Sequence, residues 1–291
     1  MNTSTALDEF IAGRADWSKE QPAHHRYIIT LFGLFGRPAG KAIPVATIVK
    51  LLAELNSEPS SVRSSISRLK KREVLVSKKT AWGNGYALNE QLEAHMQAGD
   101  ERIFSSRAAS MTDPWLLVSF SVPESERKNR HIIRTGLARI GFGTVAAGLY
   151  IGPAHLKAEI SAYIQEHQLW NYVDLFVCEA SAHMDLTHKI AHWWNLDAIA
   201  NEYQHFVDLY QTEAQHWQQL HRQQRATPQA AFQLYVPMMT HWRRLPYLDP
   251  GLPTELLPSD WIGLKARKVF HDLQRLLHTL AAQYVEQAIA A

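Results

Sequence analysis

A short segment of the sequence carries many of the side chains that could hold an anion. Between Ser60 and Thr80 there are seven basic residues and one acid, Glu73, whereas the whole chain of 291 residues has a formal net charge of only +2. A local excess of positive charge on a nearly neutral chain is typical of a surface that binds one anionic partner. A solvated helix surface would explain the same charges, so the interpretation depends on the residues around them.

Four of these basic residues fall on one side of a helix predicted from about Pro59 to Arg72. At about 100° per residue, Val62, Ile66 and Leu69 share a narrow sector that must face the core. The opposite sector and its flanks hold only small hydroxyls and long cations: Ser60, Arg63, Ser64, Ser67, Arg68, Lys70 and Lys71. Small side chains let a helix enter a major groove about 12 Å wide, and arginine can pair bidentately with guanine. An ordinary exposed helix mixes both signs of charge, so the pattern predicts a helix that recognises double-stranded DNA.

A β-hairpin is predicted directly after this helix. The residues of 74–80 and 86–88 suit strands, and Gly83-Asn84-Gly85 supplies the positive φ angles of a tight turn. Lys78, Lys79 and Trp82 would then reach backbone phosphates beside the groove, where contacts fix register rather than sequence. Packing of the hairpin onto its own domain explains Trp82 equally well.

Two further apolar helices, over 24–36 and from Pro44 to about Leu55, precede the basic helix. Three helices followed by a hairpin predict a winged-helix DNA-binding domain over residues 22–88. Residues 89–112 are expected to form a polar helical connector. The sequence therefore predicts a multidomain α+β protein whose DNA-binding domain comes first.

Several segments resemble the PaaX family of transcriptional repressors of phenylacetate catabolism. They are YIITLFG from Tyr27, RPAGKAIPVATIVKLLAEL, SVRSSISRLKK, LARIGFGTVAAGLYIGP over 137–153 and LPYLDPGLPTELLPSDWIGLKA over 245–266. The resemblance spans residues 24–285. It implies a homodimeric repressor that binds a palindromic operator and is released by an aryl-acyl-CoA thioester, typically phenylacetyl-CoA. The chain departs from the family after the basic helix, where Arg72-Glu73-Val74-Leu75 replaces the usual Gly-Trp pair, and in the hairpin turn, which lacks arginines.

The middle of the chain has a different pattern. Residues 113–182 read as strand, helix, strand, strand, helix, strand, which predicts a ferredoxin-like α+β domain. Such domains commonly self-associate, so its expected role is dimerisation. Residues 183–291 are predicted to be a helical C-terminal domain.

The effector of such a repressor would need an aromatic pocket and cations for phosphates. Trp193, Trp194 and Tyr203 are candidates for the pocket, and Arg243 and Arg244 could form charge-assisted bonds with the phosphates of CoA. Each has an ordinary alternative, because the aromatic residues could be core and the arginines could sit at a helix end near its negative dipole.

No catalytic constellation is evident, so the protein is expected not to be an enzyme and to need no cofactor. His188 and His192 stand four apart, as zinc ligands on a helix would, but this spacing is weak evidence and no metal is predicted. The alternative function is a metal-dependent nuclease or another enzyme built on the ferredoxin-like domain, which would need clustered carboxylates. A single cysteine, Cys178, and the lack of a long apolar run predict a cytoplasmic protein without a membrane partner.

Overall fold

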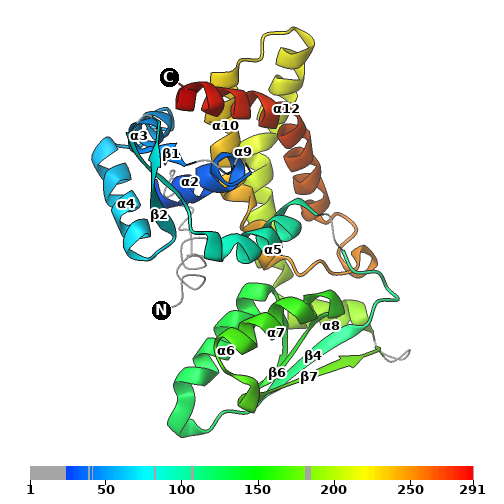
Figure 1. Ribbon diagram of the computed structural model, residues 1–291. Coiled ribbons are helices and arrows are strands. Elements are labelled where there is room, and N and C mark those ends of the chain that lie inside the picture. Colours follow the sequence, from blue (N-terminus) through cyan, green and yellow to red (C-terminus); the bar gives the residue numbers. More distant parts are fainter. Residues whose placement is uncertain are drawn as a thin grey trace. The chain divides into compact units, whose positions relative to one another are not determined.

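The computed structural model describes residues 24–290 except 39, 41, 82, 106–107 and 181–184 (Figure 1). These residues form two compact units, and neither is continuous in sequence. The first unit contains the described residues of Met1–Ile103, Phe206–Arg244 and Lys265–Ala291. The second contains those of Phe104–His205 and Leu245–Leu264. Trp82, a predicted DNA contact, lies outside the described residues.

The first unit begins with helices and a small sheet. Along the chain these elements are α2 (His24–Leu31), the π-helix η1 (Phe32–Gly36), β1 (Ile43–Pro44), α3 (Val45–Ala53), α4 (Pro59–Lys71), β2 (Leu75–Thr80) and β3 (Gly83–Leu88). The sheet is antiparallel in the order β1-β3-β2, and Tyr86 of β3 lies between Ile43 and Ser77. Helices α2, α3 and α4 pack against one another around residues such as Ile28, Ile48 and Leu52, which are fully buried.

The helix predicted over 24–36 changes its winding at Phe32. The last five residues, Phe32–Gly36, form a π-helix, a wider turn that periodicity alone does not reveal. Phe35 lies with its ring centroid 6.5 Å from that of Phe232 and 6.4 Å from that of Tyr235, both on α10 (Pro228–Trp242). The π-helix therefore ends against a helix from a distant part of the sequence.

The remaining elements of the first unit are helical. They are η2 (Glu90–Leu92), α5 (Glu93–Phe104), α10, and those parts of α9 (Leu196–Arg222) and α12 (Ile262–Ala290) that begin at Phe206 and Lys265. Trp242 of α10 stacks on Phe270 of α12 with centroids 4.2 Å apart. On the part of α9 in this unit, the aromatic residues Phe206, Tyr210 and Trp217 are buried, so they belong to its core.

The second unit is built on a four-stranded antiparallel sheet. Its central elements are β4 (Trp115–Phe120), α6 (Arg127–Ile140), β5 (Gly143–Ala146), β6 (Leu149–Pro153), α7 (Lys157–Glu166) and β7 (Val173–Cys178). The strand order β5-β6-β4-β7, with one helix in each crossover, is consistent with the predicted ferredoxin-like fold. The 3-10 turns η3 (Glu124–Glu126), η4 (Ala154–Leu156) and η5 (Trp170–Tyr172) lead into α6, α7 and β7.

The two faces of this sheet are buried differently. Residues of α6 and α7, such as Ile133, Leu137 and Ile160, form one apolar cluster with Leu116 and Val118 of β4. A second cluster joins Trp115 and Ile151 to residues of α8 (Leu186–Trp193) and η6 (Thr254–Leu256). The short helix α11 (Leu245–Leu248) packs against α6.

None of the helices in the described part of the chain combines the length and apolar character that spanning a membrane requires.

Candidate nucleic-acid interface

Helix α4 has one buried face. Val62 and Leu69 are fully buried, Ile66 is 3% exposed, and Ser65 beside them is also buried. These residues face α2 and α3, which pack against α4. The predicted apolar sector is therefore confirmed, and it fixes which side of the helix points outward.

The outward face of α4 is polar and cationic. All of the predicted contact residues of the helix are exposed: Ser60, Arg63, Ser64, Ser67, Arg68, Lys70 and Lys71. Among the described residues, no acid forms an ion pair with Arg63, Lys70 or Lys71, while Arg68 donates to Ser65 Oγ at 3.2 Å. In Figure 1, α4 lies at the margin of the first unit. Charge on this face is thus directed to solvent rather than neutralised within the protein.

The C-terminus of α4 adds one cation that the prediction omitted. Arg72, the C-cap residue, is exposed; it is one of the seven basic residues between Ser60 and Thr80 but was not among the predicted contact residues. Glu73 follows with a φ of +59°, and the Val74 N–H then donates to the Leu69 carbonyl at 3.0 Å. A left-handed residue here closes the helix and sends the chain into β2.

The β2–β3 hairpin carries the remaining predicted cations. Lys78 and Lys79 on β2 are both exposed. Lys78 Nζ lies 2.9 Å from Glu90 Oε1 of η2, and the hydrogen bond from Lys78 lowers the pKa of Glu90. Lys79 has no such partner in the described part of the chain. The two lysines therefore differ, because an anionic ligand must compete with Glu90 for Lys78 alone.

Several cationic side chains also lie near His25, at the start of α2, which packs against α4. Burial and the charges of Arg26, Arg68 and Arg243 lower the pKa of His25 from 6.5 to about 4. Thus His25 is neutral at pH 7. Sequence reasoning did not single out His25, because Arg243 is more than 200 positions away and only the fold brings the two into range.

The residues proposed for the effector lie in both units. In the second unit, Trp194 is buried and its indole N–H donates to the Gly141 carbonyl at 2.8 Å, while Trp193 is partly buried beside it. Tyr203, also buried in that unit, donates its hydroxyl to Asp249 at 2.8 Å. Arg243 and Arg244 belong to the first unit, where Arg243 donates to the Arg26 carbonyl at 3.3 Å.

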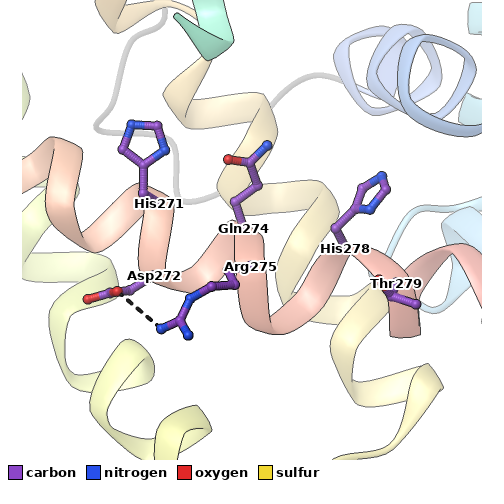
Figure 2. A pocket seen from close by; sticks show the side chains of 6 residues that line it. All are labelled: His271, Asp272, Gln274, Arg275, His278 and Thr279. Atoms are coloured by element: carbon purple, nitrogen blue, oxygen red, sulfur yellow. Dashed lines mark ion pairs between the residues drawn. The ribbon is translucent and has the colours of Figure 1, made fainter. Parts of the chain in front are cut away.

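A cavity of about 490 Å³ lies along α12 (Figure 2). Its lining residues are His271, Asp272, Gln274, Arg275, His278 and Thr279. Figure 2 shows His271, Gln274 and His278 on one side of the helix, and Asp272 paired with Arg275 at 3.5 Å on the other. This lining is polar, unlike the aromatic pocket expected for an aryl group.

The described residues hold no group of three or more histidine, cysteine or acidic side chains that could bind a metal ion. His188 lies in the first turn of α8, where its backbone N–H donates to the N-cap side chain of Asp185 at 3.1 Å. His192 lies in the last turn of the same helix. Cys178 is partly buried, and burial raises the pKa of its thiol.

Comparison with known proteins gives matches along most of the chain. The model of the PaaX-like protein matches residues 24–92, that of the PaaX protein central Cas2-like domain matches 108–190, and that of the PaaX-like protein C-terminal domain matches 194–287. Transcriptional repressor PaaX of Escherichia coli (strain K12) is 22% identical over 264 residues, which cover 89% of this chain and 82% of that protein.

A solved structure, that of the uncharacterized protein Rv0674 from Mycobacterium tuberculosis, is similar in fold. Its TM-score is 0.56 at 20% sequence identity, and the match covers 90% of this chain and 96% of that one. At this identity the likeness concerns the fold alone.

Proposed function

This chain belongs to the PaaX family, and from that premise we propose that it is a transcriptional repressor of phenylacetate catabolism that binds operator DNA. The repressor PaaX of E. coli, which matches most of the chain, supports the regulatory role.

The DNA-binding part is a winged helix in this proposal. Three helices followed by a hairpin, with β1 completing the small sheet, is the element order such a domain requires. In it α4 is the recognition helix that enters the major groove, and the β2–β3 hairpin is the wing that lies along the backbone. The observation that carries the proposal is the exposed face of α4, which presents cations and small hydroxyls without an acid.

Base contacts and phosphate contacts on this face have different signatures. Substituting Arg68 or Lys71 with Ala should weaken operator binding by about 1–3 kcal/mol where the side chain reads a base, and should lower the salt slope by about one where it meets a phosphate. Fluorescence anisotropy with DNA from upstream of phenylacetate-catabolism genes, at several salt concentrations, measures both quantities. Lys157→Ala, an exposed lysine on α7, is the matched control, and unchanged values for both α4 variants would remove α4 from the interface.

Release from the operator would be driven by an aryl-acyl-CoA such as phenylacetyl-CoA. An effector shifts the repressor only if it binds the DNA-incompetent form more tightly, since equal affinity for both forms changes nothing. Titrating phenylacetyl-CoA into the operator complex, with free CoA as the control, should dissociate it. Undiminished DNA binding at saturating thioester would refute this effector while leaving the DNA-binding proposal in place.

The repressor is further proposed to act as a homodimer in the cytoplasm, on a palindromic operator. A two-fold protein matches a two-fold DNA site, and two half-sites held together bind more tightly than one.

A further inference from the structure

The charges of the second unit are distributed unevenly. Helix α6 contains no acid, and its five lysines and arginines are Arg127, Lys128, Arg130, Arg134 and Arg139. Elsewhere among the described residues of this unit, the only other lysines or arginines are Lys157 and Lys189, and acidic residues are far more numerous. A helix of one charge sign on an acidic body is typical of a surface that holds an anionic partner.

The first turn of α6 is cationic where helix stability favours the opposite charge. Arg127, Lys128 and Arg130 lie in this turn, which contains no acid. The N-terminus of a helix carries a partial positive charge, so cations are unfavourable there. Helix stability therefore does not account for these residues.

Two of the five cations are bound within the unit. Arg130 lies 3.1 Å from the Glu124 carboxylate and donates to the Val122 carbonyl at 2.9 Å. The guanidinium of Arg139 lies 5.2 Å from the centroid of the Tyr163 ring. Contacts of the fold thus explain these two arginines.

The other three cations are directed to solvent. Arg127, Lys128 and Arg134 are exposed, and within the described ranges no acid forms an ion pair with them. Glu126, the acid directly before α6, instead accepts a hydrogen bond from the Tyr172 hydroxyl. Their charge is therefore available to a ligand.

Arg127 and Arg134 lie on one outward stripe of α6. At about 100° per residue, seven residues return a side chain to within about 20° of the same direction, and Gly136 and Ile140 on the opposite side are buried. The two arginines are about 10 Å apart along the axis, while each strand of duplex DNA carries a phosphate about every 3.4 Å of helix axis. They can therefore meet different phosphates of one strand. Lys128 lies about 100° away, on the flank of this stripe.

The rest of the exposed face of α6 suits phosphate better than a protein partner. Its exposed residues beside the two arginines are small or polar: His131, Thr135 and Ala138. Protein interfaces are centred on large aromatic or apolar anchors, which this face lacks. Arginine, in contrast, pairs bidentately with phosphate oxygens.

We propose that Arg127 and Arg134 of α6 contact the phosphate backbone of duplex DNA, as a second cationic surface in addition to that of α4. This rests on the proposed function, because the DNA in question is the duplex that α4 is proposed to read. Phosphate contacts fix position without reading sequence. The α6 stripe therefore adds affinity for operator and for unrelated DNA alike.

Fluorescence anisotropy of the full chain, with an operator duplex and a shuffled duplex of equal length, tests the proposal. Arg127→Ala with Arg134→Ala should weaken binding to both duplexes by a similar factor, at least about tenfold, and lower the salt slope by about two. The ratio of the two affinities should stay as in wild type. A loss confined to the operator would mean that α6 reads bases and would overturn the phosphate contact.

The control is Lys128→Ala with Lys157→Ala, which removes the same charge from the same unit but leaves the stripe intact. It should change either affinity by less than about twofold, and circular dichroism should show all variants folded. Arg127→Lys with Arg134→Lys keeps the charge and should recover most of the salt slope. Unchanged binding in the arginine-to-alanine variant, or an equal loss in the lysine control, would overturn the α6 surface.

The same measurements separate this proposal from the one on which it rests. A chain that binds its operator specifically, with or without the two arginines, overturns the α6 surface and leaves the repressor in place. A wild-type chain that binds both duplexes equally, and loses this binding with the two arginines, supports the α6 surface and refutes the specific repressor. A wild-type chain that binds neither duplex refutes both.

Discussion

Strands β2 and β7 are both edge strands with exposed side chains, yet they carry opposite chemistry. On β2 the exposed residues are Ser77, Lys78 and Lys79, whereas on β7 they include Phe176 and Val177. The lysines of β2 discourage another strand from pairing and attract anions. The apolar residues of β7 do neither.

The same contrast applies to the surfaces around the two strands. Strand β2 continues the cationic face of α4, and β7 continues a sheet whose other edge is covered by α8. A place at the edge of a sheet thus does not set the kind of partner. The exposed side chains do, and here they give a cationic surface on one strand and an apolar surface on the other.

The largest effect expected is on the free energy of unfolding, from a substitution on the buried face of α4. Leu69→Ala empties a fully buried position and should lower the free energy of unfolding by about 2–5 kcal/mol. Lys71→Ala on the outer face of the same helix should change it by no more than about 0.5 kcal/mol. Urea denaturation measures both variants. Similar losses from the two would contradict the assignment of the inner and outer faces of α4.

Charge reversal on the outer face should separate the two surfaces. Lys70→Glu with Lys71→Glu should weaken DNA binding about a hundredfold, which is about 2.7 kcal/mol, and leave self-association unchanged. The matched control reverses two exposed lysines of the second unit, Lys128 and Lys157. Anisotropy and sedimentation give the two readouts. An equal loss of DNA binding in the control would mean that net charge, rather than the α4 surface, governs affinity.

The cationic surroundings of His25 should appear in the pH dependence of stability. Since the pKa of His25 is about 4 in the folded chain and 6.5 when unperturbed, the unfolded state binds more protons between these values. The contribution of His25 therefore lowers stability as the pH falls from 6.5 towards 4. The free energy of unfolding measured across this range should fall less steeply for His25→Gln than for wild type. Parallel curves would contradict the lowered pKa.

The smallest effect expected concerns the turn between the two parts of the cationic surface. Glu73 has a left-handed backbone, which strains a residue with a Cβ and suits glycine. Glu73→Gly should raise the free energy of unfolding by about 0.5–1 kcal/mol, after the greater entropy of glycine in the unfolded chain is counted. The variant also removes the acid that follows the C-cap of α4, so DNA binding should strengthen. Lower stability would show that the Glu73 side chain contributes more than its backbone strain costs.

Local features of the fold followed well from the sequence. The apolar spacing of Val62, Ile66 and Leu69 gave the inner face of α4, and the order of strands and helices after Trp115 gave the ferredoxin-like unit. These patterns depend on neighbours within a few residues, where helix and strand periodicity dominates. The π-helix at Phe32 was missed, because it depends on contacts of Phe35 with α10.

The amino-acid sequence by itself determined which side chains α4 displays, since its cations and its apolar residues follow from helical periodicity. Strand periodicity does not predict that Phe176 and Val177 are both exposed, because consecutive residues of a strand point to opposite faces. Only the tertiary structure decided which edge of the second sheet is covered, that α9, α10 and α12 share a unit with the first helices, and that Arg243 lies near His25. Such contacts join residues far apart in the chain. They are selected by how whole elements pack, and no local pattern encodes them.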